Sequence, residues 1–231
     1  MKLVLTPDLF LGKDVVIEGF SFLVLIAFFI LCYNYYKLNK KKNLLYLGIG
    51  FLLIAIAQLA TIMTKLVLYY DTTFTREVGM MIVTYKVVNS VDIFYQMGFF
   101  FHRILTLIGF YVIYKLVLKK KWTGDSYLVA YLIVLISWAS LYDNNAYYFL
   151  FHLTTIPILL LIIKNYILIY TKGHNQNTGV LVISFSLLAI GQFIFILSKF
   201  SENLFVLANV IELSSYLMLL ILIIRIIKCK K

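Results

Sequence analysis

Eight polar or ionisable side chains lie within long apolar segments of the sequence. They are Glu18, Gln58, His102, Arg103, His152, Gln192, Asn209 and Glu212. Side chains of these types can hold a polar ligand, move a proton or pair with one another. Because they are costly in an apolar phase, we expect them to face the interior of a helix bundle. They are therefore the candidate ligand site.

The candidates share one depth along their segments. Counted at the helical rise from the basic residues that end each segment, six of them lie about 22 to 30 Å from that anchor. The other half of each segment is almost entirely Leu, Ile, Val and Phe. The pattern predicts a polar band in the outer third of a bundle, with apolar packing below it.

Several candidates also have a simpler interpretation. Gln58 and Gln192 suit hydrogen bonds between helices, which would make them structural. Glu18 and His152 lie higher and could be hydrated at the membrane interface. Arg103 could extend toward the interface or pair with a carboxylate.

Glu212 is the strongest functional candidate, because a carboxylate deep in an apolar span needs a partner. Asn209, Glu212 and Tyr216 are spaced i, i+3 and i+7, which places them on one helix face. We expect Glu212 to face the bundle interior, within reach of His102 or Arg103.

Two histidines and two glutamates at one depth could also bind a metal, through His102, His152, Glu18 and Glu212. The two histidines could likewise be axial haem ligands. Each ligand would come from a different segment, and the sequence has no H-E-x-x-H or C-x-x-C spacing. No nucleophile elbow, P-loop or dinucleotide fingerprint is present either. We therefore predict neither a cofactor nor an enzymatic activity.

The composition defines the elements that must position these side chains. Of 231 residues, 63% are apolar and 13% are charged, which excludes a soluble domain. The sequence predicts an all-α, multi-pass bundle of seven transmembrane helices in a single domain over residues 1–231. The predicted spans are 15–36, 44–69, 93–118, 124–142, 146–170, 179–199 and 204–227.

Basic residues mark one side of the membrane. Thirteen lysines and arginines fall on alternate loops and at the C-terminal end, opposed there only by Asp125. The positive-inside rule then places the N-terminus outside and the C-terminus inside a cell membrane. The basic loops suit anionic lipid headgroups, so we do not expect nucleic-acid binding. Residues 1–14 do not read as a signal peptide, since Pro7 and Asp8 interrupt the apolar stretch.

An internal repeat organises the chain. Residues 47–65 and 181–199 are identical at nine of 19 positions, including Gln58 with Gln192 and Lys65 with Lys199. The same offset of 134 aligns Glu18 with His152. The chain reads as repeat A (15–118), a linker helix (124–142) and repeat B (146–227), both repeats having one orientation. We expect both lysines to extend toward the interface.

Repeat A contains an insertion at residues 71–92. Val83, Val87, Val91 and Phe94 fall at helical spacing there. The segment is either an external amphipathic helix on the bundle or an outward extension of the third span.

The second span fits the pattern LGxxFLLxAxxxL at Leu47–Leu59, and the seventh ends in the basic run Arg225–Lys231. With this pattern the chain resembles small prokaryotic, often archaeal, seven-helix membrane proteins related to the sensor regions of histidine kinases. The three-plus-one-plus-three plan is also similar in architecture to microbial rhodopsins and SWEET-type transporters. Residues 204–224 lack the lysine that a retinal Schiff base requires.

These patterns lead to three functional hypotheses. The first is a membrane sensor or ligand-binding protein that signals to an unknown cytoplasmic protein partner. The second is a small-solute transporter, and the third is an intramembrane metal-binding enzyme. A homo-oligomer is compatible with each of them.

Overall fold

The computed structural model describes residues 10, 12–40, 42–69, 90–117, 129, 131–134, 137 and 144–228. The described residues form helices and turns and contain no strand. Six long helices are α1 (Lys13–Asn39), α2 (Lys42–Tyr69), α4 (Ser90–Val117), α6 (Asn144–Gly173), α7 (Gln176–Leu197) and α8 (Glu202–Lys228). All six are long and apolar enough to cross a membrane. The chain is therefore a helical, multi-pass membrane protein, as the sequence predicts.

Two predicted elements fall mainly outside the described residues. The fourth span, 124–142, is described only at residues 129, 131–134 and 137, which are helical. The insertion 71–92 is described only where α4 begins, at Ser90. Ile133 packs against Leu107 of α4 and Phe151 of α6.

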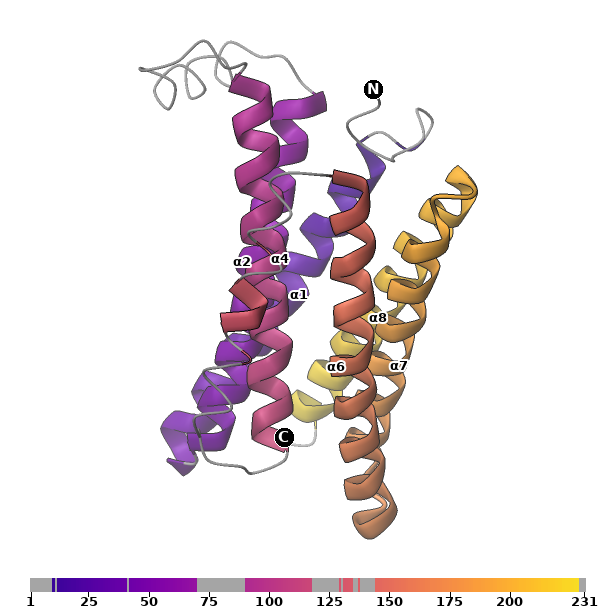
Figure 1. Ribbon diagram of the computed structural model, residues 1–231. Helices are drawn as coiled ribbons and strands as arrows, with labels where there is room; N and C mark the ends of the chain where they lie inside the picture. Colours follow the sequence, from indigo (N-terminus) through magenta and orange to yellow (C-terminus); the bar gives the residue numbers. More distant parts are fainter. Residues whose placement is uncertain are drawn as a thin grey trace.

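The direction of the helices defines two ends of the bundle (Figure 1). Helices α1, α4, α6 and α8 begin at one end, and α2 and α7 finish there. We call this the polar end, because the candidate site lies toward it. The opposite end, which we call the basic end, carries Lys40, Lys172 and Arg225 near helix termini. Helix α4 thus finishes at the basic end, and α6 begins at the polar end.

Short turns join the helices at the basic end. Lys40 adopts a left-handed backbone with φ of 55°, and its N–H donates to the Tyr36 carbonyl at 2.8 Å. His174 closes α6 in the same way, with φ of 44°. The Asn175 side chain then caps α7 by accepting from the Asn177 N–H at 2.9 Å. These caps satisfy backbone groups that the helix termini leave unpaired.

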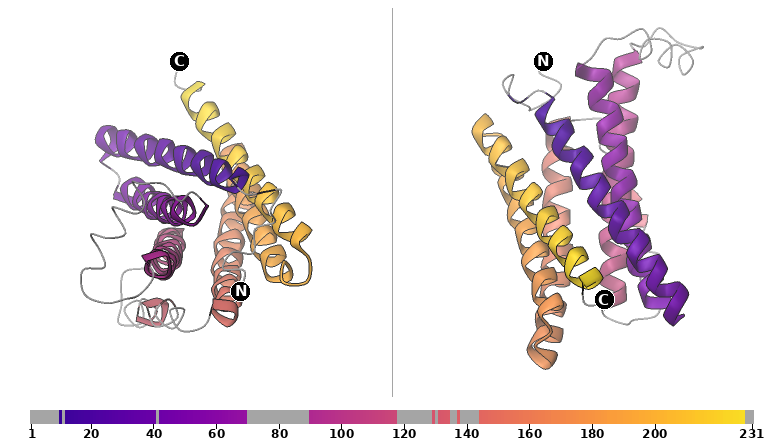
Figure 2. Two further views of the ribbon diagram at one scale, coloured as in Figure 1. Left: turned by 90° about the horizontal axis from the view of Figure 1, so that it is seen from above. Right: turned by 180° about the vertical axis from the view of Figure 1, so that it is seen from behind.

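The helices form two groups of three (Figure 2). Helices α1, α2 and α4 make the first group, and α6, α7 and α8 make the second. Within each group the middle helix packs on both others, and the groups meet where α1 contacts α8 and α4 contacts α6. Gly50 and Gly109 allow close approach in the first group: a Cβ added to either would lie 2.6 Å from an isoleucine of the facing helix.

One apolar core draws on all six helices and fills the bundle from its middle toward the basic end. At its centre the rings of Phe51 and Phe185 stack, with centroids 6.4 Å apart. Both side chains are fully buried. The polar residues of the candidate site therefore lie between this core and the polar end.

Candidate functional site

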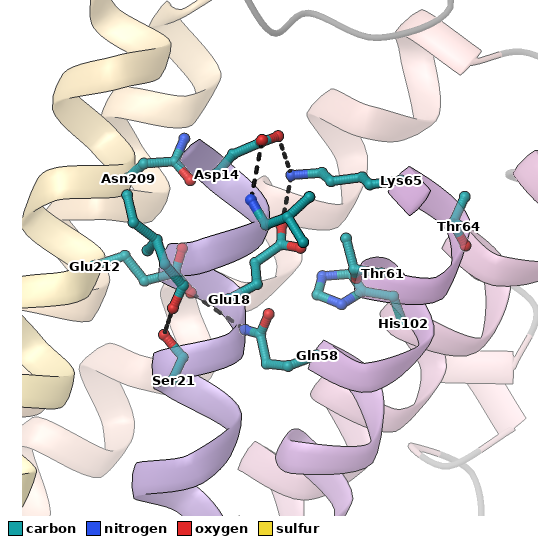
Figure 3. A network of polar contacts seen from close by, with 12 residues as sticks. Asp14, Glu18, Ser21, Gln58, Thr61, Thr64, Lys65, His102, Asn209 and Glu212 are labelled. Carbon is teal, nitrogen blue, oxygen red and sulfur yellow. Dashed lines mark hydrogen bonds and ion pairs between the residues drawn. The ribbon is translucent and has the colours of Figure 1, made fainter. Parts of the chain in front are cut away.

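A cluster of three charged side chains joins α1 to α2 near the polar end (Figure 3). The Lys65 Nζ lies 2.5 Å from Glu18 Oε1 and 2.7 Å from Asp14 Oδ2. The lysine side chain is 5% exposed and that of Asp14 is fully buried. Asp14 and Glu18 are one helical turn apart, so both carboxylates face the same lysine. We call these three residues the charged cluster.

The charged cluster corrects the expectation for Lys65. This lysine was expected to extend toward the interface, which is wrong: it points inward and bridges two acids. A buried lysine is stable here because opposite charges surround it at hydrogen-bond distance. Asp14 and Lys65 were not among the predicted site residues. The available signal was the i, i+4 spacing of Asp14 and Glu18, which places two acids on one face and requires a cation at their depth.

A second contact links the two helix groups. The Gln58 Nε2 on α2 donates to Glu212 Oε1 at 3.5 Å and to Tyr216 Oη at 3.4 Å, both on α8. The Tyr216 hydroxyl also donates to Glu212 Oε1, at 3.1 Å. Glu212 therefore faces the bundle interior, and Figure 3 shows it opposite Gln58.

The contacts of Glu212 differ from the pairing predicted with His102 or Arg103. His102 Nδ1 lies 3.2 Å from the Ala57 carbonyl of α2. The imidazole therefore contacts the backbone of α2, on which α4 packs. Arg103 is also buried. The hydrogen bonds to Glu212 come from Gln58 and Tyr216, and reach to His102 or Arg103, directly or through water, stays a prediction.

The second helix group has a neutral cluster at its own polar end. His152 Nδ1 of α6 lies 2.6 Å from Gln192 Oε1 of α7. The Phe195 ring stacks on the imidazole at 5.1 Å, and the Tyr148 ring meets it edge-on at 4.4 Å. The Tyr148 hydroxyl lies 3.5 Å from Ser198 Oγ. We call these five residues the histidine cluster.

Asn209 is buried but serves its own helix. Its amide donates to the Phe205 carbonyl at 2.8 Å. The structure thus brings the eight predicted residues to one end of the bundle and divides them among separate contacts.

Those contacts do not assemble a metal site. Among the residues that the structure describes, no three His, Cys, Asp or Glu side chains lie together as metal ligands. Glu18 is bound to Lys65, and Glu212 is bound to Gln58 and Tyr216. The arrangement instead suits hydrogen bonding and ion pairing with a polar ligand.

Among the residues that the structure describes, two buried polar atoms of the site have no hydrogen-bond partner. They are Glu18 Oε2 and His152 Nε2. Buried polar atoms are rarely left unpaired, and each such atom marks a place where a ligand or water could bind.

Comparison of the chain with protein-family models, curated proteins and solved structures finds no match. We therefore infer function from the geometry of the site.

Proposed function

We propose that this protein is a cell-membrane sensor that binds a polar ligand at the polar end and signals to a cytoplasmic partner at the basic end. The observation that carries the proposal is the contact of Gln58 with Glu212 and Tyr216. It is a polar contact between the two helix groups, and below it the groups meet through an apolar core. A ligand that competed for this contact would change how α2 and α8 pack against each other.

The distribution of polarity favours a sensor over a transporter. A transporter needs a route for its solute through both halves of the bundle. The half toward the basic end is packed with buried side chains such as Phe28, Phe51, Leu159 and Leu222. A closed apolar half suits a protein that transmits helix movement.

We also propose the parallel repeat and an N-outside orientation. Three observations support the repeat: the two groups share one order of helix directions, the α1–α8 contact has its counterpart in the α6–α4 contact, and Phe51 stacks on Phe185. The two phenylalanines are 134 positions apart, and a residue meets its own equivalent only near a two-fold axis. The basic end would face the cytoplasm and its anionic lipids.

The sensor proposal is tested by measuring whether the polar contact controls the basic end. Spin labels at Tyr46 of α2 and Ile224 of α8 report that end, because both side chains are more than 40% exposed. Cys32 and Cys229 are first replaced, so that only the two introduced sites are labelled. The distance between the two spin labels is then measured by pulsed electron paramagnetic resonance. We expect Gln58→Leu to shift or broaden the distance by about 1–2 Å or more, the scale of helix shifts in switching proteins.

Gln192→Leu is the matched control. It removes the same amide from the equivalent position of α7, where the contact stays inside the second helix group. It should leave the distance between the labels unchanged. An unchanged distance in Gln58→Leu would mean that the contact does not affect helix positions at the basic end, and the sensor proposal would fail.

A further inference from the structure

Three polar atoms from the two helix groups meet in the bundle interior. They are Gln58 Nε2 of α2 and the Glu212 Oε1 and Tyr216 Oη atoms of α8. Their three separations are all measured: 3.5 Å from Gln58 to Glu212, 3.4 Å from Gln58 to Tyr216 and 3.1 Å from Tyr216 to Glu212. Gln58 is 5% exposed and Tyr216 is 2% exposed. Figure 3 shows the Gln58 amide directed toward Glu212. We call these three atoms the polar triangle.

Hydrogen bonding accounts for only part of the polar triangle. Protein N–H···O bonds are usually about 2.7–3.2 Å long, and those to a charged acceptor are shorter still. The Gln58 amide lies 3.4 and 3.5 Å from the two acceptors that share it. These long contacts hold the end of the side chain weakly. A half-turn of the amide exchanges its two ends and brings Gln58 Oε1 to the place of Nε2. The polar triangle then consists of three oxygen atoms.

The dimensions of the polar triangle fit an ion of a particular size. Ligands at right angles about an ion are separated by about 1.4 times the bond length, as in octahedral coordination. Separations of 3.1 to 3.5 Å therefore correspond to ion–oxygen bonds of about 2.2–2.5 Å. Mg²⁺ requires shorter bonds, of about 2.0–2.1 Å, whereas Ca²⁺ takes bonds of about 2.3–2.6 Å. Na⁺ has nearly the ionic radius of Ca²⁺, and K⁺ is larger than both.

The chemistry of the polar triangle decides between the two ions of suitable size. It offers a carboxylate, an amide carbonyl and a hydroxyl, and hard cations prefer such oxygen ligands. The phenol oxygen of Tyr216 keeps lone pairs beyond the proton that it donates to Glu212. The three groups together carry a single negative charge, on Glu212. A monovalent cation neutralises this charge, while a divalent cation would leave a net positive charge within the apolar bundle.

We propose that the polar triangle binds one sodium ion, coordinated by the Gln58 carbonyl, the Glu212 carboxylate and the Tyr216 hydroxyl. This inference rests on the proposed function, because it names the ligand class of the contact that carries it. Gln58 belongs to the first helix group, and the other two ligands belong to the second. Coordination replaces the two long contacts of Gln58, so the ion draws α2 and α8 together at the polar end.

The test is equilibrium dialysis of radioactive sodium against the full-length chain in nanodiscs. The pH is fixed, and choline chloride keeps the ionic strength constant. We expect saturable binding of about one ion per chain, with unlabelled Na⁺ as the most effective competitor. K⁺ and Mg²⁺ should compete at least about tenfold less effectively, because their bond lengths do not match the triangle.

Four variants assign the binding to the polar triangle. Glu212→Gln keeps the shape of the side chain but removes its charge, and saturable binding should be lost. Tyr216→Phe and Gln58→Leu each remove one neutral ligand and should weaken binding by about tenfold or more. Gln192→Leu is the matched control, because it removes the equivalent amide of α7, which is bound to His152. It should leave sodium affinity unchanged. Retained helical circular dichroism and a single size-exclusion peak show that each variant is folded.

Three results would overturn the inference. Absence of saturable sodium binding by the folded chain would mean that hydrogen bonds alone occupy the triangle, with Glu212 free to take up a proton. Sodium binding that survives Glu212→Gln or Tyr216→Phe would place the ion elsewhere. A preference for Ca²⁺ or K⁺ would make the charge or the size of the ion wrong. The spin-label comparison is made in choline buffer without sodium, so each of these results leaves the sensor proposal to be judged separately.

Discussion

In each helix group the middle helix packs on both others, but the contacts at the polar ends of the two groups differ in chemistry. In the first group, an ion-pair cluster of Asp14, Glu18 and Lys65 joins α1 to α2. In the second, a neutral imidazole–amide pair surrounded by aromatic rings joins α6 to α7. The equivalent of Lys65 is Lys199, which is exposed.

The difference follows from which residues stand at equivalent positions. At an offset of 134, Asp14 corresponds to Tyr148 and Glu18 to His152. Once the two acids of α1 are replaced by a phenol and an imidazole, a buried lysine has no anion beside it and must remain in contact with solvent or headgroups. In the proposed repeat, these substitutions place a charged site in the first helix group and a neutral one in the second.

The largest expected effect comes from breaking the charged side of this comparison at its cation. Lys65→Met should lower the free energy of unfolding by about 3–5 kcal/mol, because it removes the cation that both buried carboxylates contact. Unfolding in mixed micelles, followed by circular dichroism as the denaturing detergent is increased, measures the change.

Lys199→Met is the matched control at the equivalent position. The exposed lysine should contribute no more than about 0.5 kcal/mol. The combination Lys65→Met, Asp14→Asn and Glu18→Gln should recover most of the loss, since no unpaired charge remains. Equal costs for the two single lysine variants would show that the halves do not differ as described.

This lysine also shows where sequence reasoning stops. The bounds of the six long helices that the structure describes could be predicted within a few residues, because the length of an apolar run fixes the length of a span. The depth of Gln58, His152 and Glu212 followed from counting residues along those runs. Lys65 lies near the end of a run, where a charge suits either solvent or a buried partner. Which of the two occurs depends on how α1 and α2 approach each other, and periodicity alone does not contain that information.

The partner of Glu212 was not predicted for a related reason. Helical spacing gives the face of a residue on its own helix, but it does not rank the side chains that meet it from other helices. Gln58 reaches Glu212 because α2 and α8 face each other across the bundle interior. His102 Nδ1 instead contacts the Ala57 carbonyl of α2. The same limit applies to the histidine cluster: the place of Tyr148 near the end of a span suits an interfacial anchor, but it does not give the contact of Tyr148 with His152 or Ser198.

A smaller effect compares the two equivalent glutamines. Gln192→Leu leaves the buried Nδ1 of His152 without its 2.6 Å partner and should cost about 1–3 kcal/mol of unfolding free energy. Gln58→Leu removes longer contacts of 3.4 and 3.5 Å, and Glu212 keeps the Tyr216 hydroxyl. It should cost about 1 kcal/mol or less. The same unfolding measurement ranks the two, and the reverse order would contradict the assignment of Gln192 as a structural partner and Gln58 as the movable one.

The smallest expected effect is at Tyr148, the equivalent of Asp14. The Tyr148 hydroxyl lies 3.5 Å from Ser198 Oγ, and that serine already donates to the Phe195 carbonyl at 2.6 Å. Tyr148→Phe should therefore cost about 0.5 kcal/mol or less, because the ring that packs on His152 is retained. Asp14→Asn should cost about 1–3 kcal/mol, since it removes one of the two anions that hold Lys65. If Tyr148→Phe instead proved as costly as Asp14→Asn, the hydroxyl would be a fixed part of the histidine cluster. The two groups would then both depend on a polar contact at this position, and the contrast between a charged and a neutral half would lie in Lys65 alone.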